Sequence, residues 1–407
     1  MKFWKRLAIW KKALLILLLL LVLFATVVVG FAVRFWLNLV GSGSQICIPQ
    51  GTRTVLFTTL TTIKAIRPGP DGRLEETTID LGERGAEASP ILPIGCMPDE
   101  AMWVPLFDWT TESVRDEKTG RRRYPQWNHL LRLDLETLEC VPIIRTRGYI
   151  FPQKTINCLD DHLAVMKPNF VQGTLFGPDL LAIFDMSEAT CAAISASLKA
   201  HRGVILLGEH DYVGVGYDLL PDDPWKEYYS DKPGYLSHNG QKMTDNVYEV
   251  LGATPDLSRV FFVKHEPQAC EATVSALWTY SPDGGAMRRL MDWTGEKLRV
   301  TSDSRSFGFL ETREAGKRHR RIVMGVQVFD IDGNLIRHIR FAEPLRPTGL
   351  RWGAYDWSPD WGIIAYFNKP YIVIQSLEGS VLGRFRTLHY VDIKDCLRRA
   401  RQTDHTG

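Results

Sequence analysis

The stretch YDWSPDWGIIAYF, residues 355–367, decides the fold. Pro359 suits the opening of a type I turn because its ring presets φ, the Asp360 side chain can hydrogen-bond to the local backbone, and Gly362 accepts a positive φ. Residues 363–367 are β-branched, aromatic or small, and they predict a buried strand. The larger fold therefore depends on whether this turn and strand recur along the chain.

The element does recur, at ATPDLSRVFFV (253–263) and in weaker form at TSDSRSFGFL (301–310), with starts 48 and about 55 residues apart. Residues 54–81 supply a further unit with its own P-D-G turn. A second element is a hairpin in which apolar strands flank a polar turn. Its copies lie about 46 to 51 residues from their neighbours, apart from one gap near 200–250: 129–143, 180–194, 276–290, 325–341 and 371–385.

A period near 50 residues with four strands per repeat predicts an all-β fold, a β-propeller of four-stranded blades. About seven blades, or six, fit between residues 47 and 395. The rival architecture is a pair of β-sandwich domains. It would show turns about every 8 to 12 residues but no period near 50. Because closure removes exposed edges, we expect a late strand at 387–393 to pair with an early one.

The residues S-P-D followed by I-A-Y-F resemble the WD40-like, TolB-type propeller repeat, whose usual form is an S-P-D-G turn followed by a strand. Here Trp361 in one copy and Leu257 in another take the place of the family's glycine. The resemblance covers residues 250–390 and, more faintly, 55–195. It implies a repeat that mediates protein contacts. Peptidases of this kind carry a further α/β-hydrolase domain, for which this chain ends too soon.

The N-terminal part differs from the rest. Residues 13–33 carry no charge, and as a helix they would span about 31 Å, one hydrocarbon core. A cleaved signal peptide would have a shorter apolar core and a small-residue cleavage site, which FAVRFW (31–36) does not offer. Five cations precede the span, so we expect the N-terminus in the cytoplasm. The predicted layout is a basic N-terminus 1–12, a transmembrane helix 13–33, a linker 34–46, a propeller 47–395 and a polar tail 396–407.

The outer 361 residues carry 43 basic and 47 acidic groups, which is close to neutral and argues against a nucleic-acid binder. The basic runs at 121–123 and 317–321 are interpreted as solvated loops, with contact to acidic lipid or glycan as the alternative. None of the asparagines begins an N-x-S/T sequon, which favours a bacterial envelope over a eukaryotic lumen. We expect a single-pass protein of the cytoplasmic membrane with its C-terminal domain periplasmic or extracellular.

All seven cysteines fall on the outer side, where an oxidising compartment would permit up to three disulfides and leave an odd thiol. The spacing does not reveal the pairing. No C-x-x-C occurs, so neither a zinc knuckle nor a thioredoxin-like motif is indicated.

The common local catalytic signatures are absent from the sequence, and the ten histidines are scattered. FDIDGN (329–334) superficially resembles a calcium loop, but it lies where a hairpin needs a turn. His210 lies beside Asp211, an arrangement that could mark general-base chemistry. A core or loop histidine is the simpler interpretation. We therefore predict no catalytic residue, cofactor or metal. A channel site built from several blades would leave no spacing signal.

Residues 217–242 interrupt the repeat, and their Pro, Gly, Asp and Ser content predicts a long loop. This segment also holds tryptophan and tyrosine residues, which have two explanations: packing back on a blade, or an interaction surface. The predicted partner-binding residues are Trp225, Tyr228, Tyr229 and Tyr235.

Two classes of function follow from these observations. The first is a membrane-anchored extracytoplasmic propeller that serves as a protein-interaction or scaffold module of an envelope complex, with a protein partner and the bilayer as its contacts. The alternative is a propeller enzyme, a hydrolase or lyase, or a glycan-binding sensor with its site in the central channel. The absence of local catalytic motifs favours the non-enzymatic class.

Overall fold

The structure, a computed structural model, divides the chain into two compact units, residues 1–43 and 44–407. No described helix is long and apolar enough to cross a membrane, and the predicted span 13–33 lies outside the described residues except for helical Phe24. The described residues are 24, 45–58, 62–81, 88–90, 101–108, 114–115, 122–123, 127–147, 163–166, 170–171, 174–175, 180–185, 192–193, 198–199, 201–208, 211–216, 233–267, 273–315, 320–347, 355–368 and 371–386.

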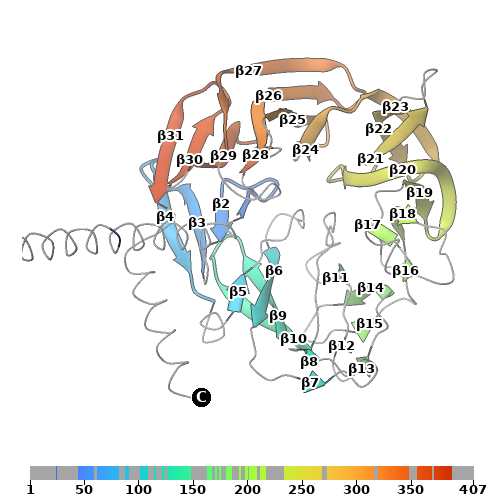
Figure 1. Ribbon diagram of the computed structural model, residues 1–407, viewed down its shortest axis with the longest axis horizontal. Helices are drawn as coiled ribbons and strands as arrows, with labels where there is room; N and C mark the ends of the chain where they lie inside the picture. The colour runs from blue at the N-terminus through green and yellow to red at the C-terminus, as the bar shows by residue number, and fades with distance from the viewer. Residues whose placement is uncertain are drawn as a thin grey trace, which may run out of the picture. The chain divides into compact units, whose positions relative to one another are not determined.

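The stretch at 355–367 forms the turn and strand that the sequence predicts. β28 (Tyr355–Ser358) is followed by β29 (Ile363–Asn368), and Ser358 lies opposite Ile363 across the antiparallel ladder. Gly362 closes the turn with φ 69°, and its N–H donates to the Ser358 carbonyl at 3.0 Å. β30 (Tyr371–Ser376) and β31 (Val381–Arg386) complete a sheet in the order β28-β29-β30-β31, the last blade in Figure 1.

Other sheets repeat this order of consecutive antiparallel strands. The first contains β1 (Ile46–Cys47), β2 (Val55–Thr58), β3 (Ile63–Pro68) and β4 (Leu74–Ile79). The second contains β5 (Ala88–Pro90), β6 (Ala101–Asp108), β9 (Trp127–Asp134) and β10 (Cys140–Arg147), and another contains β24 (Gly295–Val300), β25 (Ser306–Ala315), β26 (Arg320–Asp330) and β27 (Leu335–Leu345). Shorter pieces are β7 (Val114–Arg115) with β8 (Arg122–Arg123), β12 (Phe170–Val171) with β13 (Thr174–Leu175), and β14 (Leu180–Asp185) with β11 (Leu163–Met166), β15 (Ala192–Ala193) and β16 (Leu198–Lys199).

One sheet has seven strands because two four-stranded sets share a strand. It contains β17 (His201–Leu206), β18 (Tyr212–Gly216), β19 (Gly234–His238), β20 (Gln241–Ala253), β21 (Val260–Pro267), β22 (Thr273–Ser281) and β23 (Ala286–Asp292). β20 pairs with β19 up to Val247 and with β21 from Val247 onward. It therefore serves as the outer strand of one set and the inner strand of the next.

This sheet corrects the prediction of one long loop at 217–242. Its last part is the β19–β20 hairpin, closed by Asn239 (φ 50°) and Gly240 (φ 81°). An Asn-Gly pair favours the two-residue turn in which both residues have positive φ, and this turn suits the twist of paired strands. The Pro- and Asp-rich residues 217–232 lie outside the described residues. The five hairpins that the sequence does predict are confirmed, each as a pair of antiparallel strands.

The hydrophobic cores lie between successive sheets, so the described sheets pack face to face. One cluster joins β1–β4, β24–β27 and β28–β31 around Trp357, another joins the first two sheets around Leu56, and a third joins β20–β23 to β24–β27 around Phe307. Residues on both faces of β29 are buried for this reason. Four-stranded antiparallel sheets that follow the chain order and bury both faces against neighbouring sheets are the blades of a β-propeller. The predicted number of seven or six blades stays a prediction, because residues 163–199 are described only in part.

The first and last blades are each complete within their own segment. β1–β4 come entirely from residues 46–79, and β28–β31 come entirely from residues 355–386. The predicted closing strand at 387–393 lies outside the described residues. Side chains join these two blades: Ile48 and Val55 pack in the same cluster as Trp357 and Ile372. In the described part of the ring, the end blades are therefore joined by side-chain packing and by the hydrogen bond from the Ile48 N–H to Asp356, and they share no described strand.

Candidate functional site

The carboxylate of Asp356 joins three blades at the inner strands. Asp356 lies in β28 and is 1% exposed, and its Oδ2 accepts a hydrogen bond from the Ile48 N–H of the first blade at 2.8 Å. The same oxygen accepts from Nη2 of Arg299, which projects from β24. The side chain of Arg299 is 14% exposed. One buried ion pair thus connects the first blade, the last blade and the β24–β27 blade.

The environment of Arg299 keeps this pair charged. Burial alone lowers the pKa of the guanidinium, but the charge of Asp356 and the contact with Cys47 outweigh it and raise the pKa above its ordinary value. Asp356 Oδ1, by contrast, is a buried oxygen that has no hydrogen-bond partner among the described residues. Buried polar atoms of proteins are nearly always hydrogen-bonded, so this oxygen is an acceptor available to a donor that reaches the inner strands.

A second set of contacts links the blades at the ends of the strands where the turns lie, called here the turn end. Asp360 Oδ1 in the last blade accepts from the Ser302 N–H at 3.0 Å and from its hydroxyl at 3.2 Å. The Asp256 N–H donates to Ser304 Oγ at 3.3 Å in the same neighbouring blade. The sequence predicts that the Asp360 side chain bonds to the backbone of its own turn, and its observed partners show that this is wrong. It bonds instead to the two donors that Ser302 of the adjacent blade offers.

A chain of three polar side chains lies at the turn end of the seven-stranded sheet. His238 Nε2 is 2.6 Å from Asp211 Oδ1, and His238 Nδ1 is 2.7 Å from the hydroxyl of Tyr280. The side chain of His238 is 20% exposed, whereas Tyr280 is 1% exposed. Asn239 Nδ2 also donates to Asp211 Oδ1, at 2.9 Å. Both ring nitrogens of His238 are therefore occupied by protein groups, and in this arrangement the ring links blades and does not present a free nitrogen to a substrate.

The sequence pointed to Asp211 through its neighbour His210, whereas the histidine that the structure places beside Asp211 is His238. His210 lies outside the described residues. His238 and Tyr280 lie 27 and 69 residues further along the chain, and only the pairing of β18 with β19 and of β21 with β22 brings them to one place. Burial, and then the charge of Asp211, raise the pKa of Tyr280. The signal available in the sequence was the Asn-Gly turn, which sets His238 at the end of a strand.

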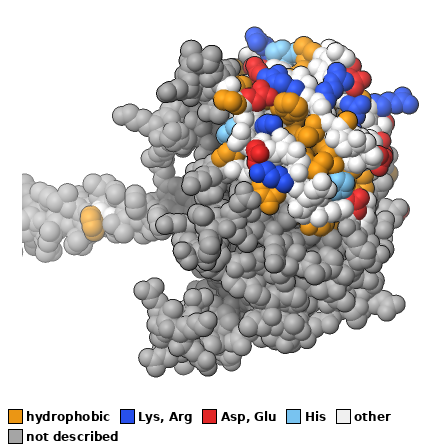
Figure 2. Space-filling model, turned by 90° about the vertical axis from the view of Figure 1, so that its right-hand side faces the viewer, with side chains coloured by type: hydrophobic (Ala, Val, Ile, Leu, Met, Phe, Trp, Pro, Cys, Tyr) orange, Lys and Arg blue, Asp and Glu red, His pale blue; other side chains and the backbone are white. Residues whose placement is uncertain are grey.

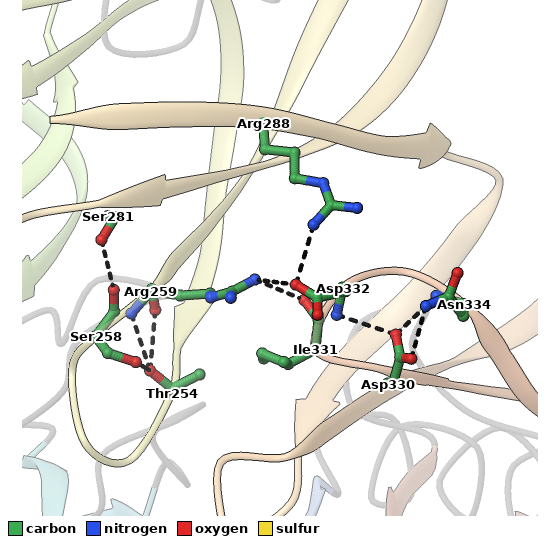
Figure 3. A network of polar contacts seen from close by, with 9 residues as sticks. All are labelled: Thr254, Ser258, Arg259, Ser281, Arg288, Asp330, Ile331, Asp332 and Asn334. Carbon is green, nitrogen blue, oxygen red and sulfur yellow. Dashed lines mark hydrogen bonds and ion pairs between the residues drawn. The ribbon is translucent and has the colours of Figure 1, made fainter. Parts of the chain in front are cut away.

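The FDIDGN segment is a hairpin turn, as predicted, and its carboxylates hold protein groups (Figure 3). Asp330 Oδ1 accepts from the backbone N–H groups of Asp332 and Asn334 at 3.0 and 2.8 Å. Asp332 Oδ1 pairs with Arg259 at 3.1 Å and with Arg288 at 3.0 Å, both from the β20–β23 blade. Within the described ranges, no group of three His, Cys, Asp or Glu side chains is placed to hold a metal ion.

Of the predicted partner-binding residues, Trp225, Tyr228 and Tyr229 lie outside the described residues. Tyr235 lies in β19 and is half-buried. Its ring covers Gly216, where an added Cβ would lie 2.4 Å from Tyr235 Cε2, and Lys242 Nζ lies 5.2 Å from the ring centroid. Tyr235 thus packs on its own sheet, and its role as a partner contact stays a prediction.

Two of the seven cysteines, Cys47 and Cys140, are described, and neither forms a disulfide with another described residue. They lie in the cluster between the first two blades. Burial, and then the charge of Asp80, raise the pKa of the Cys140 thiol to about 12, so this thiol stays protonated and unreactive at neutral pH.

One described face of the molecule is mixed in charge. Figure 2 shows hydrophobic, basic and acidic side chains interspersed over the described part of one face. Such a surface lacks the single-sign field that steers a protein onto a polyanion.

No protein-family model and no curated protein sequence matches the chain. Solved structures with a similar fold include an oligogalacturonate lyase from Vibrio parahaemolyticus, with 11% identity over 80% of this chain and 86% of that chain and a TM-score of 0.46. Another is the β-propeller domain of the Trilobed protease from Pyrococcus furiosus, with 12% identity over 86% of this chain and 97% of that chain and a TM-score of 0.43. A third is TolB from Acinetobacter baumannii, with 12% identity over 83% of this chain and 78% of that chain and a TM-score of 0.36. At these identities and TM-scores, the likenesses assign neither a family nor an activity.

Proposed function

We propose that the protein is a single-pass, membrane-anchored, extracytoplasmic β-propeller that acts as a protein-interaction or scaffold module of a bacterial envelope complex. The observation that carries this proposal is the joint at Asp356, where a buried ion pair and a hydrogen bond hold three blades together. A scaffold needs a frame that keeps its loops in fixed positions, and links between blades provide that frame. The uncharged span 13–33 with its preceding cations supports attachment to a membrane.

The segment at 217–232 is the proposed contact for the protein partner. It emerges between β18 and β19, and its aromatics belong to the residue types that carry most binding energy in interfaces. β18 and β19 are paired from Val213 opposite His238 to Gly216 opposite Tyr235, so both ends of this segment start from a fixed hairpin. A long segment on a rigid base is a common way for scaffolds to present binding residues.

The test compares recovery of cross-linked partners from intact membranes. We expect Trp225→Ala with Tyr229→Ala to lower recovery at least several-fold while the melting midpoint of the full chain in detergent is unchanged. Tyr371→Ala is the matched control, since Tyr371 is an aromatic of β30 that is 38% exposed. A fall in the midpoint of the double variant would show that these aromatics pack on the blade, and the interaction proposal for this segment would then fail.

The alternative function, a propeller enzyme or glycan-binding sensor with a site in the central channel, is favoured by Asp356 Oδ1. This carboxylate oxygen is buried on an inner strand and has no partner within the described part of the chain, so it is suited to a hydroxyl or ammonium donor of a ligand. Thermal melts of the full chain with panels of neutral and acidic oligosaccharides would distinguish the two functions. A saturable rise of the midpoint with one sugar class favours the alternative, and unchanged midpoints favour the scaffold.

A further inference from the structure

Four aliphatic side chains are exposed on the outermost strands of two blades. Leu335 and Ile336 open β27 and are 56% and 59% exposed, and Val381 and Leu382 open β31 and are 48% and 47% exposed. Each pair directly follows the turn into the fourth strand of its blade, so the two pairs occupy equivalent places in the repeat. We call these four residues the aliphatic pairs.

A bulge explains why two consecutive side chains are exposed in each blade. Ile336 has no residue opposite it in the β26–β27 ladder, and Leu382 has none in the β30–β31 ladder, because the register shifts at both places. An extra residue interrupts the alternation that would direct one member of the pair toward the core. The bulges therefore present both members of each pair at the surface.

An ion pair places the aliphatic pairs on one continuous surface. Arg337, the residue after Ile336, donates from Nη2 to Glu378 Oε1 at 3.1 Å, and Glu378 lies in the turn just before Val381. The contact joins β27 to the β30–β31 turn of the next blade. We call the aliphatic pairs and the outer faces of β27 and β31 the rim surface.

The rim surface also carries more basic than acidic side chains, with Glu343 as the exposed carboxylate of β27. Beyond the aliphatic pairs, β27 carries exposed Arg340, and β31 carries exposed Arg384 and Arg386. Among the described residues, no carboxylate forms an ion pair with any of these three guanidinium groups, in contrast to Arg337. Exposed aliphatic groups next to unneutralised cations form an amphipathic surface.

The composition favours a lipid surface over a protein partner. Protein interfaces concentrate their binding energy in Trp, Tyr and Arg and make little use of Leu and Val, whereas interfacial membrane contacts combine aliphatic groups with Lys and Arg. The chain length also allows this contact. The 12 residues 34–45 extend at most about 40 Å, and they lead into β1, whose blade packs on the β28–β31 blade.

We propose that the rim surface docks on a bilayer that carries anionic phospholipid headgroups. The aliphatic pairs enter the boundary between headgroups and acyl chains, and Arg340, Arg384 and Arg386 contact the phosphates. This inference rests on the membrane anchor of the proposed function. Docking would hold the propeller against the membrane in one orientation, and so would restrict which loops a partner can reach.

The test measures hydrogen exchange of the full chain in nanodiscs made of phosphatidylcholine alone or mixed with phosphatidylglycerol. We expect peptides covering 335–345 and 381–386 to exchange at least several-fold more slowly in the anionic discs. Ile336→Asp with Leu382→Asp should abolish this protection, and so should Arg384→Glu with Arg386→Glu. Arg305→Glu with Arg313→Glu, two exposed arginines at the ends of β25 in the same blade as β27, is the matched control and should leave the protection unchanged.

Exchange of the buried strand 363–368 serves as the internal reference for folding in every variant, and the charge variant remains informative if the aspartate variant unfolds. Equal exchange in both kinds of disc, with the chain inserted, would overturn the docking and leave the anchor intact. Protection that appears in neutral discs and rises with the number of chains per disc would mean that a second copy covers the surface, which also overturns the proposal. A chain that does not stay with the discs would contradict the anchor, and the docking with it.

Discussion

Asp360 in the last blade bonds to Ser302 in the neighbouring blade, 58 residues away, and accepts from both its N–H and its hydroxyl. The S-P-D turn is therefore a joint between blades as well as a reversal of the chain. The pairing of Asp256 with Ser304 places an equivalent joint one blade earlier. Residues that look like local turn formers in the sequence thus hold the turn ends of three successive blades together.

We expect Asp360→Ala to destabilise the full chain by about 0.5–2 kcal/mol, because two donors on Ser302 lose their acceptor. Both residues are exposed, which keeps the effect at this modest size. Urea denaturation in detergent would measure it, with Ser302→Ala and the double variant completing a thermodynamic cycle. If the two single effects simply add, the contact between the blades contributes nothing, and any effect of Asp360 is local.

A larger effect is expected at the inner strands. Asp356→Ala leaves the guanidinium of Arg299 buried without its partner, and removing one member of a buried ion pair costs about 3–5 kcal/mol. The double change Asp356→Leu with Arg299→Leu removes both charges, so it should destabilise less than Asp356→Ala does. Denaturant midpoints of the three chains would show this order. The reverse order would mean that packing around Asp356, and not its charge, holds the blades.

The local elements followed from the sequence because their causes are local. Alternating apolar residues and polar turns set the five hairpins, three of which have a glycine at positive φ in the turn, and Gly362 at positive φ closes the turn between β28 and β29. The loop prediction at 217–242 failed in its last part because composition was averaged over the whole segment. The Asn239-Gly240 pair, a strong hairpin signal, was outweighed by the prolines that precede it.

The candidate site did not follow from the sequence because its contacts join distant segments. Ile48 and Asp356 are 308 residues apart, and Asp211 reaches Tyr280 only through His238. No spacing rule connects such residues, since the ring of blades brings them together after the local strands have formed. Sequence patterns in a propeller therefore reveal the blade and conceal what lies between blades.

The chain from Asp211 to Tyr280 predicts a dependence of stability on alkaline pH. Burial and the charge of Asp211 raise the pKa of Tyr280, so the unfolded chain releases this proton at a lower pH than the folded chain. The resulting stability is fully present below about pH 10, the ordinary tyrosine value, and is lost as the pH rises through the higher folded pKa. We expect Tyr280→Phe to flatten this alkaline loss.

At neutral pH the same variant should cost about 0.5–1.5 kcal/mol, because the hydrogen bond to His238 Nδ1 is removed. Urea midpoints measured from neutral to strongly alkaline pH would give both quantities. Tyr371→Phe, at an exposed tyrosine, is the control and should follow the parent chain. An alkaline profile of Tyr280→Phe that is parallel to that of the parent would show that Tyr280 does not contribute the titration.

The orientation of the chain in the membrane is the remaining prediction. The cations that precede the uncharged span 13–33 are Lys2, Lys5, Arg6, Lys11 and Lys12, whereas Arg34 alone follows it closely. The N-terminus should therefore stay in the cytoplasm, and the C-terminus should lie outside. Fusions at the C-terminus would test this, because alkaline phosphatase is active only outside the cytoplasm and a fluorescent protein matures inside it. We expect phosphatase activity without fluorescence. Replacing the five cations by glutamine removes the charge bias and should shift part of the population toward fluorescence. A fluorescent parent chain would show that the orientation is the reverse of the one proposed.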